Sequence, residues 1–213
     1  MADIAVIDYG MGNLRSVEQA LRHVAGERSV VVTSDPDQVQ AAGRVVFPGQ
    51  GAMPDCIREL DARGLRQPVL DAAASKPFLG ICIGLQMLFE HSEEGDMAGL
   101  GILPGRVRRF PSGMTNAAGE KLKVPHMGWN EVRQTRSHPL WAGIAQDARY
   151  YFVHSYYVEP RDAGLEAAYT EYPFRFTSAV GRDNIFAVQF HPEKSQQSGL
   201  SLLFNFVNWD GRP

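Results

Sequence analysis

The first 90 residues alternate short apolar runs with segments whose apolar residues recur at helical spacing. Residues 4–8 form an apolar run, and residues 13–24 then place Leu or Val at every third or fourth position, as on one face of a helix. Three later runs have strand length and composition, namely 29–33 (SVVVT), 44–47 (RVVF) and 78–82 (FLGIC). Residues 55–65 and 67–75 predict helices. Strands separated by helices predict right-handed crossovers and a parallel sheet.

From residue 101 onward the pattern favours strands. The runs are 102–110 (ILPGRVRRF), 150–158 (YYFVHSYYV), 165–172 (LEAAYTEY), 174–180 (FRFTSAV) and 185–190 (IFAVQF). A helix is predicted around residues 200–207, and residues 111–125 predict a polar loop or irregular hairpin. Without a repeat or linker, we expect one domain over residues 1–213. Its predicted fold is α/β and flavodoxin-like, with a mostly parallel central sheet flanked by helices and an antiparallel extension in the C-terminal half.

Composition narrows the class of protein. With 44% hydrophobic residues among 213, the chain can bury a sizeable core, and its formal charge of −3 gives no support to general nucleic-acid binding. No apolar run approaches the roughly 18 residues of a membrane helix, and the start, MADIAVIDYG, does not resemble a secretory signal. Two cysteines, Cys56 and Cys82, make no disulfide framework. We therefore expect a cytoplasmic protein with reduced thiols and with neither membrane nor nucleic-acid partners.

The segment Gly80-Ile81-Cys82-Ile83-Gly84 joins an apolar strand to a predicted buried helix. It fits the G-x-S-x-G template of a nucleophile elbow, with sulfur in place of the serine hydroxyl. A nucleophile on such a sharp turn crowds its neighbours two positions away, and glycine relieves that crowding. The following helix would direct its N-terminal N–H groups and dipole toward the thiol, which favours the thiolate. The alternative is a buried structural cysteine, the commonest role of a free cysteine.

A thiol nucleophile needs a base, and the base needs an orienting group. His191 follows an apolar strand in FAVQFHPEKS, and Glu193 lies two positions further, on the same side of an extended chain. Pro192 between them favours an extended His191. A strand-end turn is the simpler interpretation of H-P-E alone, and zinc would have only these two candidate ligands. The elbow and H-x-E together predict a Cys-His-Glu triad without a metal.

The oxyanion hole has a candidate in Gly49, Gln50 and Gly51, which follow the 44–47 strand after a proline. Glycines let such a loop point N–H groups at a developing negative charge, although Pro-Gly after a strand is most often only a turn. In IDYGMGNL, Arg15 stands where a dinucleotide-binding motif has its third glycine, and no phosphate-binding G-x-x-x-x-G-K occurs. We predict no cofactor. The residues alone indicate thiol-mediated acyl transfer on a small amide or ester.

The segments PGQGA, GICIGLQ and QFHPEKSQ, in this order and spacing, resemble the class I glutamine amidotransferases that use a Cys-His-Glu triad. Further segments resemble the branch of that family that serves histidine biosynthesis, over essentially the whole chain: DYGMGNLRSV, GLGILPGRVRRF, KVPHMGWNEV, YYFVHSYYV and FHPEKSQQSGL. The sequence departs from the commoner family pattern by Gln50 in place of Val, which leaves the preferred conformation of the loop open. Ile83 and Leu85 are conservative departures.

The resemblance implies a role for each matching residue. Cys82 attacks the side-chain amide of glutamine, His191 transfers the protons and Glu193 orients His191. The amide of Ile83 and one from Gly49, Gln50 or Gly51 hold the oxyanion, while glutamine is positioned by Gln86, Ser155 and Tyr156.

The resemblance also implies a heterodimer with a cyclase subunit of the (β/α)₈-barrel type. The ammonia passes to that partner, which forms imidazole glycerol phosphate and an aminoimidazole-carboxamide ribotide. Trp129 is the candidate anchor of the partner interface, with Met11 and Asn13 near it, because Trp is a frequent interface hot spot. His126 is assigned an interface or structural role. The alternative for Trp129 is a place in the core.

Three other functions remain open from the sequence. The chain resembles, less closely, glutaminases of other pathways and a γ-glutamyl hydrolase. A non-catalytic subunit on the same fold would be expected to lack Cys82, His191 or Glu193, yet all three are present. A redox-sensing thiol protein on a flavodoxin-like sheet would have no need of H-P-E.

Overall fold

The computed structural model describes residues 2–116 and 118–213. Its first half alternates strands and helices, as the sequence predicts. In chain order these are β1 (Ile4–Ile7), α1 (Leu14–Val24), β2 (Val30–Thr33), α2 (Pro36–Ala41), β3 (Arg44–Gly49), α3 (Met53–Ala62), α4 (Arg66–Ser75), β4 (Phe78–Cys82) and α5 (Ile83–Gln86).

The second half is mostly strands and ends in a long helix. Its elements are β5 (Phe89–Ser92), β6 (Met97–Ala98), β7 (Leu103–Arg109), β8 (His126–Gln134), β9 (Ala148–His154), β10 (Tyr156–Pro160), β11 (Glu166–Glu171), β12 (Arg175–Arg182), β13 (Ile185–Val188) and α6 (Gln196–Asn208). Three short 3₁₀ helices interrupt it: η1 (Pro139–Trp141), η2 (Ala163–Leu165) and η3 (Pro192–Lys194).

The central sheet has the strand order β2-β1-β3-β4-β13-β12-β10-β7-β5-β6. The first five strands are parallel, and β13 joins them from the far end of the chain by pairing with β4. Beyond β13 the pairings of β12, β10 and β7 are antiparallel. The predicted parallel sheet with an antiparallel extension is therefore confirmed.

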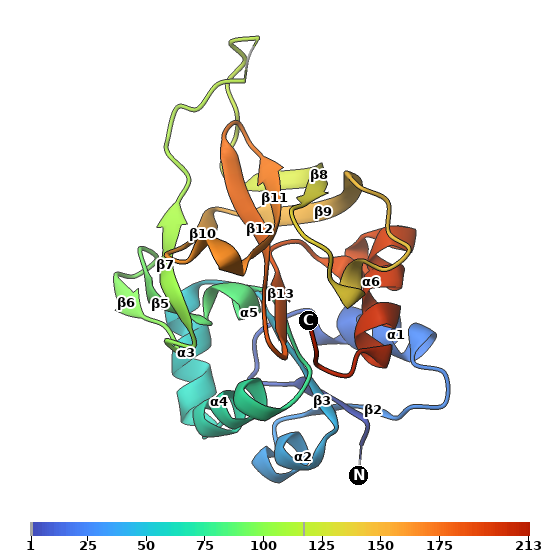
Figure 1. Ribbon diagram of the computed structural model, residues 1–213. Helices are drawn as coiled ribbons and strands as arrows, with labels where there is room; N and C mark the ends of the chain where they lie inside the picture. Colours follow the sequence, from blue (N-terminus) through green and yellow to red (C-terminus); the bar gives the residue numbers. More distant parts are fainter. Residues whose placement is uncertain (1, 117) are drawn as a thin grey trace.

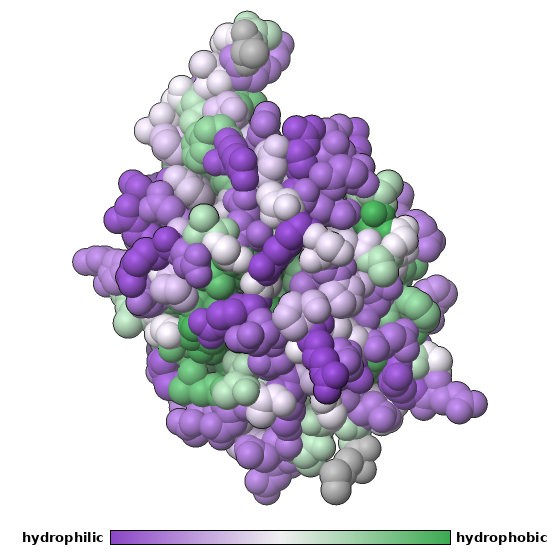
Figure 2. Space-filling view, viewed as in Figure 1, coloured by the Kyte–Doolittle hydropathy of each residue, from purple (hydrophilic) through white to green (hydrophobic). Residues whose placement is uncertain are grey.

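Helices cover both faces of the parallel sheet (Figure 1). The helices α1 and α6 pack together on one face, and α2 and α4 lie together on the other. The strands β1, β4 and β13 are buried at every position, as expected when neither face meets water. The face viewed in Figure 2 is largely hydrophilic, with apolar residues gathered only in separate small areas.

Strands β8 and β9 form an antiparallel ribbon outside the main path of the sheet. The ribbon pairs His126 with His154 and Trp129 with Tyr151, and β8 joins the sheet through β11. The predicted strand at 150–158 is two strands, β9 and β10, separated at Ser155.

The segment before β8 projects from the body of the molecule (Figure 1). The sequence predicted a polar loop or an irregular hairpin for residues 111–125. A bridge between Thr115 and Lys121 shows that the described residues of this segment form an irregular hairpin. Residue 117 lies outside the described residues.

Candidate active site

Three neighbouring parallel strands end at the same edge of the sheet. In the ladder of β3 and β4, Gly49 lies opposite Cys82, and in that of β13 and β4, Val188 lies opposite Ile81. The loop after β3, the elbow after β4 and the H-P-E segment after β13 therefore meet in space. Carboxyl ends of parallel strands are the usual ligand-binding edge of an α/β sheet.

Cys82 has the strained backbone that the elbow motif predicts, with φ 56° and ψ −110°. A Cβ at Gly84 would overlap the carbonyl oxygen of Phe47 on β3, and one at Gly80 would lie 2.9 Å from the Cβ of Ala187 on β13. Both glycines are thus required by the close approach of neighbouring strands.

The helix after the elbow is shorter than predicted. It ends at Gln86 after four residues, and β5 begins three residues later. A helix does follow the elbow, as predicted, but with a single turn its dipole at the thiol is small. What the turn supplies is the backbone amide of Ile83, directly after the nucleophile.

His191 is held on both its main chain and its ring. The ring Nδ1 lies 2.8 Å from Oε1 of Glu193, as the two-residue spacing predicts, and both side chains are buried. The backbone N–H of His191 donates to the carbonyl of Tyr151 at 2.9 Å, and Ser195 Oγ donates to the carbonyl of His191 at 2.6 Å. The backbone of His191 is extended, as Pro192 predicts.

The other ring nitrogen of His191, Nε2, is buried and has no hydrogen-bond partner among the described residues. Burial alone would lower the pKa of His191. The nearby Cys82 sulfur, as a thiolate, and the Glu193 carboxylate outweigh burial and raise that pKa to about 10. His191 therefore carries a proton, as an imidazolium, at neutral pH.

Cys82 and His191 share a cavity of about 300 Å³ with most of the predicted substrate-binding residues. Of those, it is lined by Gln50, Gly51, Ile83, Gln86, Ser155 and Tyr156. Gly49 lies at the carboxyl end of β3, opposite Cys82, outside the cavity wall. Free glutamine is of a size that such a cavity admits.

Gln189 is a buried site residue that the sequence reasoning did not single out. Its Nε2 lies 3.8 Å from Cys82 Sγ, and its Oε1 accepts a hydrogen bond from Gln86 Nε2 at 3.0 Å. The same Gln86 nitrogen donates to the carbonyl of Tyr156 at 3.2 Å, which leaves Gln86 Oε1 without a partner among the described residues. The sequence could have indicated Gln189 by its position, because it lies two residues before His191 and so falls on the same side of an extended chain.

Glu94 is a second site residue found only in the structure. Its carboxylate lines the cavity, and Oε2 accepts from the backbone N–H of Met53 at 2.8 Å. Burial raises the pKa of this carboxyl, and the Met53 bond opposes the rise. No motif marks Glu94, which lies in a charged stretch, HSEEGD, typical of a solvent-exposed turn.

The end of β3 and the loop after it are fixed by two buried donors, each of which bonds a backbone carbonyl group. The Tyr9 hydroxyl donates to the carbonyl of Pro48 at 2.9 Å, and Cys56 Sγ lies 3.7 Å from the carbonyl oxygen of Gln50. Burial, with a smaller contribution from Cys82, raises the pKa of Cys56 to about 11, so this thiol stays protonated and can donate. Cys56 therefore has a structural role in holding this loop.

The four predicted interface residues differ in exposure. Asn13 is exposed, and Met11 is half-buried with its methyl group beside Gly51. Trp129 is 40% exposed, so the alternative of a core Trp is wrong. His126 is only 3% exposed and stacks between Phe152 and Tyr172. Its assignment as an interface residue needs correction: it cannot touch a docked partner from this position, and of the two roles considered its burial supports the structural one.

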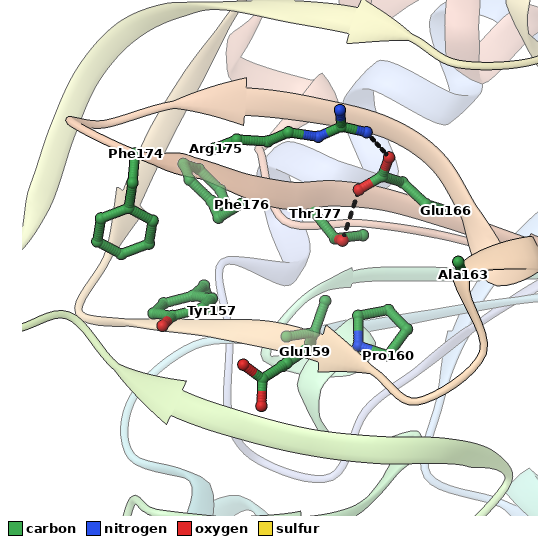
Figure 3. A pocket seen from close by; sticks show the side chains of 10 residues that line it. Tyr157, Glu159, Pro160, Ala163, Glu166, Phe174, Arg175, Phe176 and Thr177 are labelled. Atoms are coloured by element: carbon green, nitrogen blue, oxygen red, sulfur yellow. Dashed lines mark hydrogen bonds and ion pairs between the residues drawn. The ribbon is translucent and has the colours of Figure 1, made fainter.

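A larger cavity of about 410 Å³ lies between β10 and β12 (Figure 3). Its charged side chains are already paired: Arg175 with Glu166, which also accepts from Thr177 Oγ1 at 2.9 Å, and Glu159 with Arg106 at 2.7 Å. It contains no thiol, hydroxyl or imidazole beside a free base, so the smaller cavity at Cys82 is the candidate active site.

Within the described residues, no three His, Cys, Asp or Glu side chains gather as metal ligands. None of the helices described is both long and apolar enough to cross a bilayer.

The family described as "Glutamine amidotransferase class-I" matches residues 5–209 of the chain. Solved structures agree on the fold: one described as a glutamine amidotransferase superposes with a TM-score of 0.72 at 16% identity, covering 98% of this chain and all of that one. A second, from Thermoplasma acidophilum and described as belonging to a GMP synthase, gives a TM-score of 0.69 at 19% identity, covering 98% of this chain and 93% of that one. The chain therefore belongs to the class I glutamine amidotransferases, and it is an enzyme.

Curated relatives define the branch. A protein of Aromatoleum aromaticum is 69% identical, and one of Nitrosospira multiformis is 67% identical, each covering 98% of this chain and 99% of the relative. Both are named imidazole glycerol phosphate synthase subunit HisH. This chain belongs to the same branch, so the predicted resemblance is confirmed at both levels.

Proposed function

We propose that this chain hydrolyses glutamine to glutamate and ammonia at Cys82, as the glutaminase subunit of an imidazole glycerol phosphate synthase in histidine biosynthesis. The observation that carries the proposal is the arrangement of His191. Its Nδ1 is bonded to Glu193, its Nε2 has no partner among the described residues, and the residue lines a cavity shared with a thiol on a strained turn. This is the order of contacts that a nucleophile, base and orienting acid require.

The first half of the reaction forms a thioester. The Cys82 thiolate attacks the side-chain carbonyl carbon of glutamine, and the new oxyanion accepts N–H bonds from Ile83 and from the loop of Gly49, Gln50 and Gly51. As the C–N bond breaks, the His191 imidazolium gives its proton to the leaving nitrogen, and ammonia departs. The raised pKa of His191 supplies that proton at neutral pH.

The second half releases glutamate. His191, now neutral, takes a proton from water, which attacks the thioester carbon. The C–S bond breaks, glutamate leaves, and the thiolate and imidazolium are restored. Glu193 keeps the ring oriented throughout through its bond to Nδ1.

Glutamine is held by groups on the cavity wall. Oε1 of Gln86, which has no partner among the described residues, can accept from an N–H of the substrate, and the Glu94 carboxylate suits its α-ammonium group. Ser155 and Tyr156 also line the cavity, with hydroxyl and backbone groups that fit the α-carboxylate.

The ammonia would pass to a partner subunit. The curated relatives are named as subunits of a synthase. We propose a heterodimer with a (β/α)₈-barrel cyclase, which docks through Met11, Asn13 and Trp129.

The test is glutamate release from glutamine by wild type and by Cys82→Ala, with and without the cyclase subunit and its ribonucleotide substrate. We expect strong stimulation of the wild type by the complete mixture and none of Cys82→Ala. If the activity does not depend on the cyclase, the chain is still a glutaminase, but its assignment to histidine biosynthesis is wrong. An inactive wild type in every mixture would remove both.

A further inference from the structure

A chain of buried hydrogen bonds leads from β8 to the glutamine-binding wall. His154 Nδ1 lies 2.7 Å from the carbonyl oxygen of Tyr156, and its Nε2 lies 2.9 Å from His126 Nδ1. His126 Nε2 in turn lies 3.2 Å from Nδ2 of Asn130. Three side chains on the β8–β9 ribbon thus connect to the backbone of a residue that lines the cavity.

The partners fix the direction of every bond in this chain. A carbonyl oxygen only accepts, so His154 must carry its proton on Nδ1 and accept at Nε2. His126 then donates from Nδ1 and accepts at Nε2 from the Asn130 amide, whose nitrogen also donates to the carbonyl of Glu171 at 3.0 Å. Both imidazoles are therefore neutral. An added proton would place two N–H groups against each other at one of the junctions.

The surroundings keep both imidazoles in this state. The His126 ring lies between Tyr172, at 4.0 Å between ring centroids, and Phe152, at 4.9 Å. Burial lowers the pKa of His126 to about 4, and burial together with the charge of a protonated His126 lowers that of His154 to about 3.

At the other end, the chain continues toward the nucleophile. The carbonyl oxygen of Tyr156 also accepts from Gln86 Nε2, Gln86 donates to Gln189 Oε1, and Gln189 Nε2 lies against Cys82 Sγ. The Tyr156 carbonyl is consequently fixed from two sides, by His154 and by Gln86. Ser155, the residue between β9 and β10, lies inside this fixed segment.

We propose that the Asn130–His126–His154 chain positions the wall formed by Ser155, Tyr156 and Gln86 and thereby sets the affinity for glutamine. His126 and His154 are then positioning residues of the glutaminase site, and the inference rests on the proposed function. The two histidines buried in an aromatic cluster give the Tyr156 carbonyl a fixed donor. Two apolar side chains in place of the histidines would fill the same space but would not supply this donor.

The test replaces His126 in two ways that separate packing from hydrogen bonding. His126→Phe keeps the stacking between Tyr172 and Phe152 but leaves His154 Nε2 without a donor. His126→Gln loses the stacking but keeps an amide that can donate to His154. Tyr172→Phe is the matched control, because it perturbs the same stack and removes only the hydroxyl bond to the carbonyl of Lys123.

The measurements are KM and kcat for glutamine in the complex with the cyclase and its ribonucleotide, together with Tm. If the chain positions the site, KM rises about tenfold in His126→Phe, less in His126→Gln and not in Tyr172→Phe, with kcat changed less than KM. If His126 has only a structural role, KM should follow the loss of Tm, and His126→Phe should then be milder than His126→Gln. That result would overturn the proposal.

A second readout does not depend on activity. Nitrogen-15 shifts of the imidazoles in the isolated chain should show His126 and His154 neutral and protonated on Nδ1 at pH 7. Protonation on Nε2 of either ring would rule out the proposed Asn130–His126–His154 hydrogen-bond chain, even if the enzyme hydrolyses glutamine. An inactive wild type that shows the expected tautomers removes the proposed function, and with it the role in glutamine affinity.

Discussion

In the proposed mechanism, Glu193 acts on the reaction only through the proton that it helps to hold on His191. Its negative charge contributes to raising the pKa of His191 to about 10, and the imidazolium is the form that protonates the leaving ammonia. Since activity is lost when this proton dissociates, the basic limb of the pH profile of kcat/KM follows that pKa.

Glu193→Gln is expected to lower kcat/KM by about 10²-fold and to move its basic limb to lower pH. The sign follows from charge: removing a nearby negative group lowers the pKa of His191, so the proton is lost earlier as pH rises. The measurement is glutamate release from about pH 6 to about pH 11, a range that covers both the ordinary and the raised pKa of His191. Glu94→Gln is the control, because that carboxylate lines the same cavity without bonding His191; it should change KM and leave the limb in place. An unmoved limb in Glu193→Gln would show that Glu193 does not tune His191.

Gln189 Nε2 donates to the sulfur of Cys82 across 3.8 Å. Gln189→Met keeps its length but removes both the donor at Cys82 Sγ and the acceptor for Gln86. We expect kcat/KM to fall about tenfold, within the range for two lost hydrogen bonds of about 0.5–1.5 kcal/mol each. Ser178→Ala is the control, since Ser178 is fully buried on the adjacent strand β12 and its hydroxyl has no partner among the described residues. Equal effects of the two substitutions would assign Gln189 to packing.

At the scale of elements, the elbow depends on how closely β3 approaches the turn after β4. Gly84→Ala would place a methyl group on the carbonyl of Phe47, which β3 cannot move without breaking its ladder with β4. We expect a loss of at least about 2 kcal/mol in the free energy of unfolding, measured with urea. Gly101→Ala is the contrasting control: it has φ +66° but no atom within 4 Å of the added Cβ, so it should cost about 1 kcal/mol. A smaller effect at Gly84 than at Gly101 would mean that the elbow has room.

The elements that the sequence predicted correctly are those whose residue patterns match one structure only. The β-branched runs became β2, β3 and β13, and the spacing of Val17 and Leu21 became the buried face of α1. The segment after Cys82 was harder because it is apolar throughout, so periodicity cannot tell where α5 ends and β5 begins.

Tertiary pairing decided the parts that the sequence missed. Strand β8 contains Gly128, Asn130 and Glu131, which have low strand propensity, and it is a strand because β9 and β11 pair with it. The triad was predictable because an elbow and H-P-E are local motifs. Gln189 and Glu94 were not, because their chemistry arises only where β13 and the segment after β5 lie beside Cys82.

At the scale of the whole molecule, large apolar side chains are exposed at three described positions, Met127, Trp129 and Phe204. Met127 and Trp129 project from the same face of β8, and Phe204 lies on α6. Met127 pairs with Val153 and Trp129 with Tyr151, and Val153 lines the cavity. The apolar part of this face, Met127 and Trp129, therefore lies next to a residue of the cavity wall, where the proposed partner would receive ammonia without its passing through bulk water.

This arrangement makes Trp129 the anchor of the proposed docking face. Trp129→Ala removes a 40% exposed indole whose ring lies 6.3 Å from that of Tyr151. We expect binding to the cyclase to weaken by about 2 kcal/mol, or roughly 30-fold in Kd, measured by calorimetry, with Tm little changed. Phe204→Ala is the matched control, because Phe204 is 53% exposed yet lies on α6, away from the β8 face. If Phe204→Ala weakened binding as much as Trp129→Ala, exposure alone would explain the loss. If only Phe204→Ala weakened it, the partner would dock on α6, and the continuity between the β8 face and the cavity would have no part in ammonia transfer.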